Sequence, residues 1–220
     1  ICLCSLDACR IHHVSLDKSK VHSAFFNANW ATNCLIDHCY GDWGIIYSSR
    51  GSRAADTDST VPEWVNCTFA DNCFWQWYGF YCHDGGTKQL ALFENCIFSN
   101  NRNQNNKDHA WSDKGRVCDF NLYQNMDPAG TTLRNCLWGR MFADSYCVTN
   151  FTDGGGNVAN ADPLFARGAK GLDEYAIPRR SPARNAGVTR AWHAAQVMPV
   201  TENFFVIMSS PFGASELSPA

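Results

Sequence analysis

The stretch Glu63-Trp64-Val65-Asn66-Cys67-Thr68-Phe69-Ala70-Asp71-Asn72 decides the fold, because the chain repeats its centre. The shared unit is Asn-Cys-x-(large apolar residue), and its other copies begin at Asn33, Asn95 and Asn135. The Cys residues of the four copies are separated by 33, 29 and 40 residues. Five Asn-Cys pairs occur in the chain, whereas its 19 Asn and 12 Cys residues would give about one by chance, so the repeat is a structural signal.

Periods of this length are typical of solenoids and propellers. Each copy is a short apolar segment followed by Asn, Asp or Gly, and none reads as an amphipathic helix. We therefore predict an all-β, single-stranded parallel β-helix of about six coils, each stacked on the next. The Cys and the apolar residue two positions later should face inward, and the Asn should occupy a bend, where its side chain tolerates the left-handed conformation. A β-sandwich with coincidental Asn-Cys pairs is the alternative.

Composition limits the function classes. The net charge is −3 and no run of Lys or Arg occurs, which indicates that nucleic acid is not a partner. No apolar run reaches the length of a membrane span. No Gly-rich phosphate loop and no Gly-x-Ser-x-Gly nucleophile motif is present. At 220 residues the chain corresponds to one domain, and its oligomeric state is left open.

The 12 cysteines lack the tight Cys-x-x-Cys pairs of zinc ribbons. We predict mostly free thiols, with the four repeat cysteines forming a buried ladder: Cys34, Cys67, Cys96 and Cys136. The first residues do not form a signal peptide, and they lack the polar cap that a solenoid end needs. We therefore expect a processed chain or a fragment.

The remaining strands and loops follow from the apolar pattern. We predict further strands at 44–47, 77–82 and 116–123, and polar loops at 48–60 and 100–108. The β-helix should span residues 1–187. Residues 188–220 should form a C-terminal cap or tail, because an uncovered β-helix end is an exposed sheet edge.

The segment after residue 160 contains three motifs in order: Asp162-Pro163-Leu164-Phe165, then Tyr175-Ala176-Ile177, then Ser181-Pro182-Ala183 with Gly187. This order resembles the closing coil of bacterial secreted right-handed β-helix proteins, in which Asp-Pro-x-Phe precedes Tyr-x-Leu and Ser-Pro-Ala-x-x-x-Gly. The resemblance implies a right-handed coil and a bacterial protein that is extracellular or at the cell surface.

The segment Ile36-Asp37-His38-Cys39-Tyr40-Gly41-Asp42-Trp43 resembles the Ile-Asp-His-Cys-Ser-x-x-Trp segment of family-1 pectate lyases. That resemblance implies β-elimination on a uronate polysaccharide, with Ca²⁺ acidifying the proton that a base removes. The family has calcium-binding Asp and Glu where this chain has Ile46 and Tyr47, and Arg102 lies out of register with the family's Arg base.

Several residues are candidates for this chemistry. The candidate catalytic residues are Asp37, His38, Asp71 and Arg102. The candidate Ca²⁺ ligands are Asp37, Asp42 and Asp71, if adjacent coils place them together. Asp37 and Asp71 are also the candidate pair for a glycoside hydrolase, because consecutive coils lie about 4.8 Å apart. In the plainer interpretation, Asp37 and His38 are bend residues that bond the backbone.

Aromatic residues suggest a sugar-binding face, and the candidates are Trp43, Trp75, Trp77 and Tyr81. The seven histidines show no His-x-x-x-His spacing, so we expect surface or bend positions for most of them. Three function classes stay open: a polysaccharide lyase or hydrolase, a non-catalytic glycan-binding or adhesive module, and a structural fragment of a larger surface protein. Polysaccharide is the expected partner in the first two.

Overall fold

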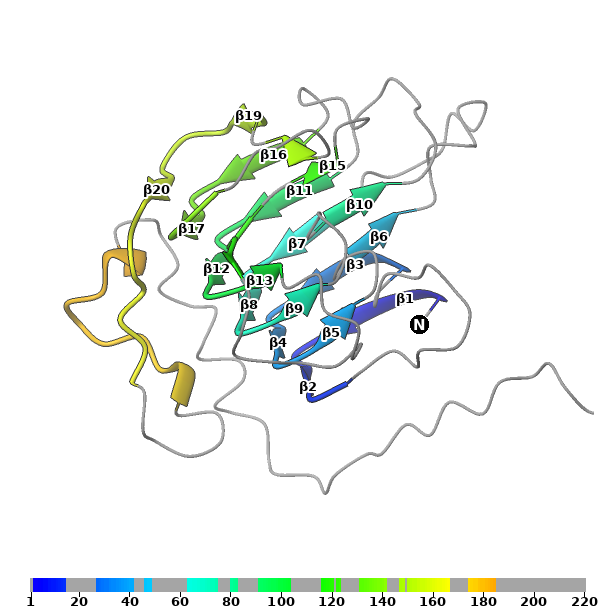
Figure 1. The fold of residues 1–220 in the computed structure, drawn as a ribbon, viewed down its shortest axis with the longest axis horizontal. Coiled ribbons are helices and arrows are strands. Elements are labelled where there is room, and N and C mark those ends of the chain that lie inside the picture. The colour runs from blue at the N-terminus through cyan, green and yellow to red at the C-terminus, as the bar shows by residue number, and fades with distance from the viewer. Residues whose placement is uncertain are drawn as a thin grey trace, which may run out of the picture.

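The computed structural model describes residues 2–14, 27–41, 46–48, 63–74, 80–82, 91–103, 116–120, 122–123, 131–141, 147–148, 150–166 and 174–184. In this part of the chain the regular structure is β-strand, apart from short helical turns near the end that include a 3₁₀ helix at Pro182–Arg184. The strands form four sheets (Figure 1). No described helix is long and apolar enough to pass through a membrane.

Two of the sheets have six strands each. In sheet order, sheet A contains β1 (Cys2–Asp7), β3 (Asn27–Thr32), β7 (Glu63–Val65), β11 (Ala91–Glu94), β16 (Thr131–Arg134) and β19 (Thr152–Asp153). Sheet B contains β2 (Arg10–His12), β4 (Leu35–Asp37), β8 (Thr68–Ala70), β12 (Ile97–Ser99), β17 (Leu137–Trp138) and β20 (Val158–Ala159).

The other two sheets have four strands each. Sheet C contains β5 (Tyr40–Gly41), β9 (Cys73–Phe74), β13 (Arg102–Asn103) and β14 (Arg116–Val117). Sheet D contains β6 (Ile46–Ser48), β10 (Phe80–Cys82), β15 (Leu122–Tyr123) and β18 (Cys147–Val148).

The path of the chain explains these sheets. From β3 onward it visits sheets A, B, C and D in turn and then returns to sheet A at β7, beside β3. All strand pairs in sheets A and B are parallel, whereas β14 and β18 each pair antiparallel with their neighbour in sheets C and D. Stacked parallel sheets visited in this order are those of a β-solenoid and are compatible with a parallel β-helix.

The Asn residues of the repeat form the corner between sheets A and B, as predicted. Asn33, Asn66, Asn95 and Asn135 all have a positive φ, between 52° and 56°. Their amides also join the turns, because Nδ2 of Asn66 donates to Oδ1 of Asn33 and Nδ2 of Asn95 donates to Oδ1 of Asn66, both at 3.1 Å. Asn suits this position because its side chain tolerates the left-handed region and bonds locally.

The interior holds the predicted ladder. Its members are the four repeat cysteines and the apolar residues two positions after them: Ile36, Phe69, Phe98 and Trp138. The Phe69 and Phe98 rings stack at 5.3 Å. Burial raises the pKa of the Cys39 thiol to about 12. The cysteines that the structure shows as free thiols are Cys9, Cys34, Cys39, Cys67, Cys73, Cys96, Cys118 and Cys136. The prediction of buried, unbridged thiols is therefore confirmed for the four repeat cysteines.

A second buried row was not predicted. Asn72 accepts from the backbone N of Cys39 at 2.9 Å and donates to the carbonyl of Ile36 at 2.8 Å. Asn101 accepts from the backbone N of Asn72 at 3.1 Å and donates to the carbonyl of Phe69 at 3.0 Å. These amides satisfy backbone groups that would otherwise be buried without partners.

This row corrects two predictions about local structure. Residues 100–108 were predicted as a polar loop, but Asn101 is 3% exposed and Arg102–Asn103 form β13. Residues 116–123 were predicted as one strand, but Asp119 and Phe120 separate β14 from β15. The predicted strand is interrupted because the Asp119 side chain turns inward and ends the amide row. Its carboxylate accepts from the backbone N of Asn101 and of Arg140.

Residues after β20 cover the outer face of sheet B. Phe165, Tyr175 and Ala183 pack against the outward-facing side chains of that sheet, including Leu35, Ile97 and Leu137. Figure 1 shows this yellow-to-gold segment along the side of sheet B. We call residues 174–184 the strap. The predicted cap at 188–220 lies outside the described residues. So does the predicted loop at 48–60, apart from Ser48, which is the last residue of β6 and not part of a loop.

Candidate functional site

A row of polar side chains follows the corner between sheets B and C. Its members are His13, His38, Asp71 and Asn100, which come directly after β2, β4, β8 and β12 and all have a positive φ between 52° and 56°. Parallel pairing places His38 beside Asp71, because Asp37 pairs with Ala70 one position earlier. We call this set the polar corner row.

Arg10 fixes the carboxylate of Asp37 from the neighbouring strand. Nε of Arg10 donates to Oδ1 at 2.9 Å and Nη2 donates to Oδ2 at 2.8 Å, which is the bidentate geometry of a strong charge-assisted pair. The Asp37 side chain is completely buried. Burial alone would raise the pKa of this carboxyl, but the bonds from Arg10 and His38 outweigh it and lower the pKa below its usual value, so Asp37 is ionised at neutral pH.

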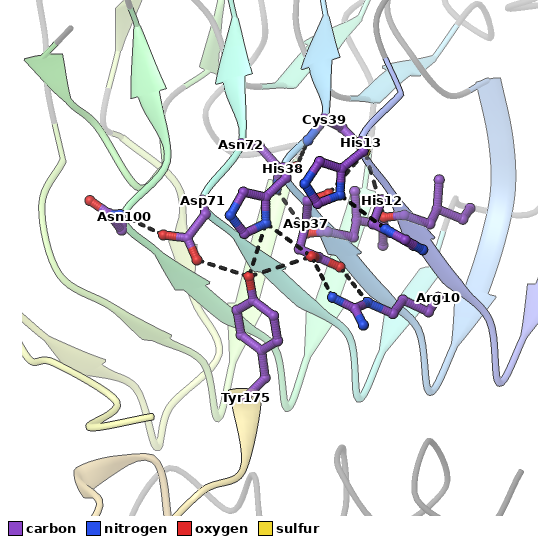
Figure 2. A network of polar contacts seen from close by, with 12 residues as sticks. Arg10, His12, His13, Asp37, His38, Cys39, Asp71, Asn72, Asn100 and Tyr175 are labelled. Atoms are coloured by element: carbon purple, nitrogen blue, oxygen red, sulfur yellow. Dashed lines mark hydrogen bonds and ion pairs between the residues drawn. The ribbon is translucent and has the colours of Figure 1, made fainter. Parts of the chain in front are cut away.

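Tyr175 of the strap closes the site from outside. Its hydroxyl lies 2.9 Å from Oδ2 of Asp71 and 3.5 Å from Oδ2 of Asp37, and the ring is 1% exposed. It also lies 3.3 Å from Nδ1 of His38 (Figure 2). Burial and the two carboxylates raise the pKa of the phenol, so Tyr175 keeps its proton. The Tyr175 hydroxyl has one proton to donate, and its shorter distance to Asp71 than to Asp37 favours donation to Asp71.

Histidines form the more exposed side of the site. Nδ1 of His38 lies 3.0 Å from Oδ2 of Asp37, and this bond raises the pKa of His38 against the effect of burial. The ring of His13 stacks in parallel on His38 at 4.8 Å, and Nδ1 of His12 lies 3.0 Å from Nδ1 of His13. Burial, followed by the nearby Arg10, lowers the pKa of His12. His12 and His13 are exposed to solvent.

The structure brings the four candidate catalytic residues into one polar network. Asp37, His38 and Asp71 meet at the Tyr175 hydroxyl. Arg102 is one residue further away, because its Nη2 donates to Oδ1 of Asn100 at 3.0 Å and Nδ2 of Asn100 donates to Asp71. Arg102 therefore reaches Asp71 through Asn100.

The other candidates are not placed at this site. Asp42, Trp43, Trp75 and Trp77 lie outside the described residues. Tyr81 belongs to β10, where it pairs with Tyr47 of β6, and the structure describes its backbone position only. The predicted aromatic face therefore stays a prediction.

The arrangement limits the chemistry of the two carboxylates. Both oxygens of Asp37 accept from Arg10, and those of Asp71 accept from Asn100 and Tyr175. Ca²⁺ needs several oxygen ligands, and in this arrangement the two carboxylates do not fit such a site. Within the described ranges no group of three or more His, Cys, Asp or Glu side chains is suited to hold a metal ion.

The sequence analysis missed several residues of the network, among them Arg10 and Tyr175. Cys9-Arg10-Ile11-His12-His13 is a further copy of the repeat, in register with Cys34-Leu35-Ile36-Asp37-His38. It begins with Ala8 in place of Asn, and Ala8 has the same positive φ, 50°. A search for Cys-x-Ile would have found Arg10. No signal in the sequence connects Tyr175 with residues more than 100 positions earlier.

Comparison with known proteins adds nothing to this picture. No protein-family model matches the chain, and no curated protein or solved structure matches it. The function therefore has to be inferred from the residues themselves.

Proposed function

We propose that the chain is a right-handed parallel β-helix of about six coils with a C-terminal cap at residues 188–220, exported by a bacterium, that binds an extracellular polysaccharide without cleaving it. The handedness, the bacterial origin and the location are those that the closing-coil resemblance implies. The polysaccharide is the partner that the resemblance of residues 36–43 to family-1 pectate lyases implies.

The polar corner row is the observation that carries this proposal. One hydrogen-bonding side chain follows each of four consecutive strands of sheet B, and neighbouring parallel strands lie about 4.8 Å apart. The row is therefore a straight line of imidazole, carboxylate and amide groups along the stacking direction. A linear polymer with a hydroxyl-rich repeat is the ligand that such a line suits.

The state of Asp37 favours binding over catalysis. A general base must reach the proton that it removes, and a calcium ligand needs an accessible oxygen. Asp37 is completely buried, and both of its oxygens accept from Arg10. The non-catalytic alternative therefore explains the described residues better than the lyase.

A glycoside hydrolase is the second candidate, and one observation favours it. The Tyr175 hydroxyl lies 2.9 Å from Oδ2 of Asp71 and 3.5 Å from Oδ2 of Asp37, so these carboxylates of consecutive strands are close enough for the pair of a retaining enzyme.

Retention in native gels containing dissolved polysaccharides, both uronate-containing and neutral, tests the proposal. We expect retention by at least one polysaccharide, and His13→Asn should weaken it at least threefold, because Asn keeps the positive φ but removes the imidazole. Asn95→Gly, at the opposite corner, is the matched control and should bind like the wild type. Retention unaffected by His13→Asn would contradict the proposal.

The same samples are assayed for unsaturated-uronate absorbance and for new reducing ends, with Ca²⁺ or with chelator. We expect neither signal. Products that disappear in Asp37→Ala would replace the binding function with an enzymatic one.

A further inference from the structure

The strap buries two carboxylates under a single aromatic ring. Asp37 is 0% exposed and Asp71 is 6% exposed, although Asp37 ends β4 and Asp71 lies at the corner that follows β8. Figure 2 shows Tyr175 reaching from the strap to the point where these carboxylates and His38 converge. One hydroxyl group therefore fills a position between three polar groups from two consecutive strands.

The strap could pack against sheet B without this polar contact. Burying charged groups costs free energy, and apolar side chains of similar volume usually hold a packed surface at least as well. The rest of the outer face of sheet B shows this, because Ile97 and Leu137 belong to one apolar cluster with Phe165 and Ala183. Departures from such local rules are expected mainly at functional sites.

We propose that Arg10, Asp37, His38 and Asp71 form a subsite for the hydroxyl groups of a neutral sugar, and that Tyr175 is an internal ligand which the sugar replaces. This inference rests on the proposed polysaccharide binding and names its substrate class. The subsite shares His38 and Asp71 with the polar corner row, so a chain bound along the row passes over it.

The groups around the Tyr175 hydroxyl match the chemistry of a sugar diol. Carboxylates accept from hydroxyl groups, and two carboxylates side by side accept from two neighbouring hydroxyls. The guanidinium of Arg10 also lies against the ring of Tyr175, with Cζ 5.9 Å from its centroid. The flat face of a sugar ring would pack at the same place.

The charges of the subsite indicate the neutral class. The subsite contains two carboxylates, Asp37 and Asp71, and the guanidinium of Arg10 already binds both oxygens of Asp37. A uronate carboxylate in the position of the Tyr175 hydroxyl would meet Asp71 at hydrogen-bond distance without a proton between them. Like charges at that separation repel, so the subsite disfavours uronates.

Titration calorimetry of the full chain with a soluble neutral glucan and with polygalacturonate tests the inference. We expect Tyr175→Ala to bind the neutral glucan at least tenfold more tightly than the wild type, because no internal ligand competes. Tyr175→Phe keeps the ring but loses the hydroxyl, and it should bind at least threefold more tightly. Asp71→Asn in the Tyr175→Ala background should remove the gain.

Two controls separate a subsite from a structural contact. Arg184→Ala removes bonds within the strap, to the carbonyls of Ile177 and Pro178, and should leave the affinity unchanged. 4-Methylphenol, which is the Tyr175 side chain as a free molecule, should raise the unfolding temperature of Tyr175→Ala but not of the wild type. The glucan should displace it.

Each other outcome has a defined meaning. Equal affinity of the wild type and both Tyr175 variants would overturn the inference while leaving the proposed binding function intact. Tighter binding of polygalacturonate than of glucan by the Tyr175 variants would overturn the neutral class. Binding of neither polymer by the wild type or by Tyr175→Phe, which keeps the packing of the strap, would overturn both the inference and the proposed function. If Tyr175→Ala does not fold, Tyr175→Phe decides.

Discussion

The buried amide of Asn101 offers the sharpest test of how this fold is stabilised. Its side chain accepts from both the backbone N and Nδ2 of Asn72, each at 3.1 Å. It donates to the carbonyl of Phe69 at 3.0 Å and to that of Asp119 at 3.2 Å. One side chain thus connects three segments of the chain inside the molecule.

Asn101→Ala removes all of these bonds at once. The backbone N of Asn72 and the carbonyls of Phe69 and Asp119 each lose a partner inside the protein. At the low end of about 1 kcal/mol for each buried group, the free energy of unfolding should fall by about 3 kcal/mol. With an m-value of about 2 kcal/mol/M, the urea midpoint should fall by about 1.5 M.

Asn95 provides the matched control. It is the same residue type in the same turn, but it is half-buried, and its side chain donates to Asn66 at the corner between sheets A and B. Asn95→Gly keeps the positive φ and should cost less than about 1 kcal/mol. Equal losses for the two variants, or a loss below about 1 kcal/mol for Asn101→Ala, would refute the claim that the inner amide row stabilises the fold.

Three further predictions concern other parts of the core. Burial raises the pKa of Asp119 to about 6, so protonation of this carboxyl stabilises the folded state by up to about 3 kcal/mol. This stabilisation is complete below about pH 4 and is lost as the pH rises through about 6. Asp119→Asn should therefore abolish the difference in the free energy of unfolding that urea titrations measure between about pH 4.5 and pH 7. A Cβ at Gly139 would collide with the Asp119 carboxylate, so Gly139→Ala should lower the free energy of unfolding by about 2 kcal/mol in the same assay. In the native protein a thiol reagent followed by peptide mapping should modify the partly exposed Cys9 well before the buried Cys96, and equal rates would contradict the buried ladder.

The corners and the inner ladder could be predicted from the sequence because they depend on local preferences. Asn-Cys-x-(apolar) combines a residue that tolerates the left-handed region with two inward-facing residues, and the repeat indicates that successive copies stack. The structure confirms this at Asn66, where φ is 54°, and at Cys67 and Phe69, which are buried together. The coil count, the C-terminal cap and the right-handed coil stay predictions.

The same local reasoning failed where a polar residue is buried by its partners. Asn101 lies in the run of polar residues that predicts a loop at 100–108, and only the position of Asn72 and Asp119 on neighbouring turns shows that it points inward. The fifth Asn-Cys pair, Asn72-Cys73, does not begin a copy of the repeat; its Asn supplies the inner amide row and its Cys begins β9.

The sequence by itself supplied the candidate residues Asp37 and His38, through the resemblance of residues 36–43 to family-1 pectate lyases, and Asp71, which follows the next repeat cysteine by four positions. Only the tertiary structure decided their surroundings. Strand pairing set His38, and not Asp37, beside Asp71. The strap brought Tyr175 to Asp71 across 104 positions and to Asp37 across 138. The physical reason is that a bend depends on a few adjacent residues, whereas the burial and ionisation of a carboxylate depend on the charges and hydroxyls that other parts of the chain place against it.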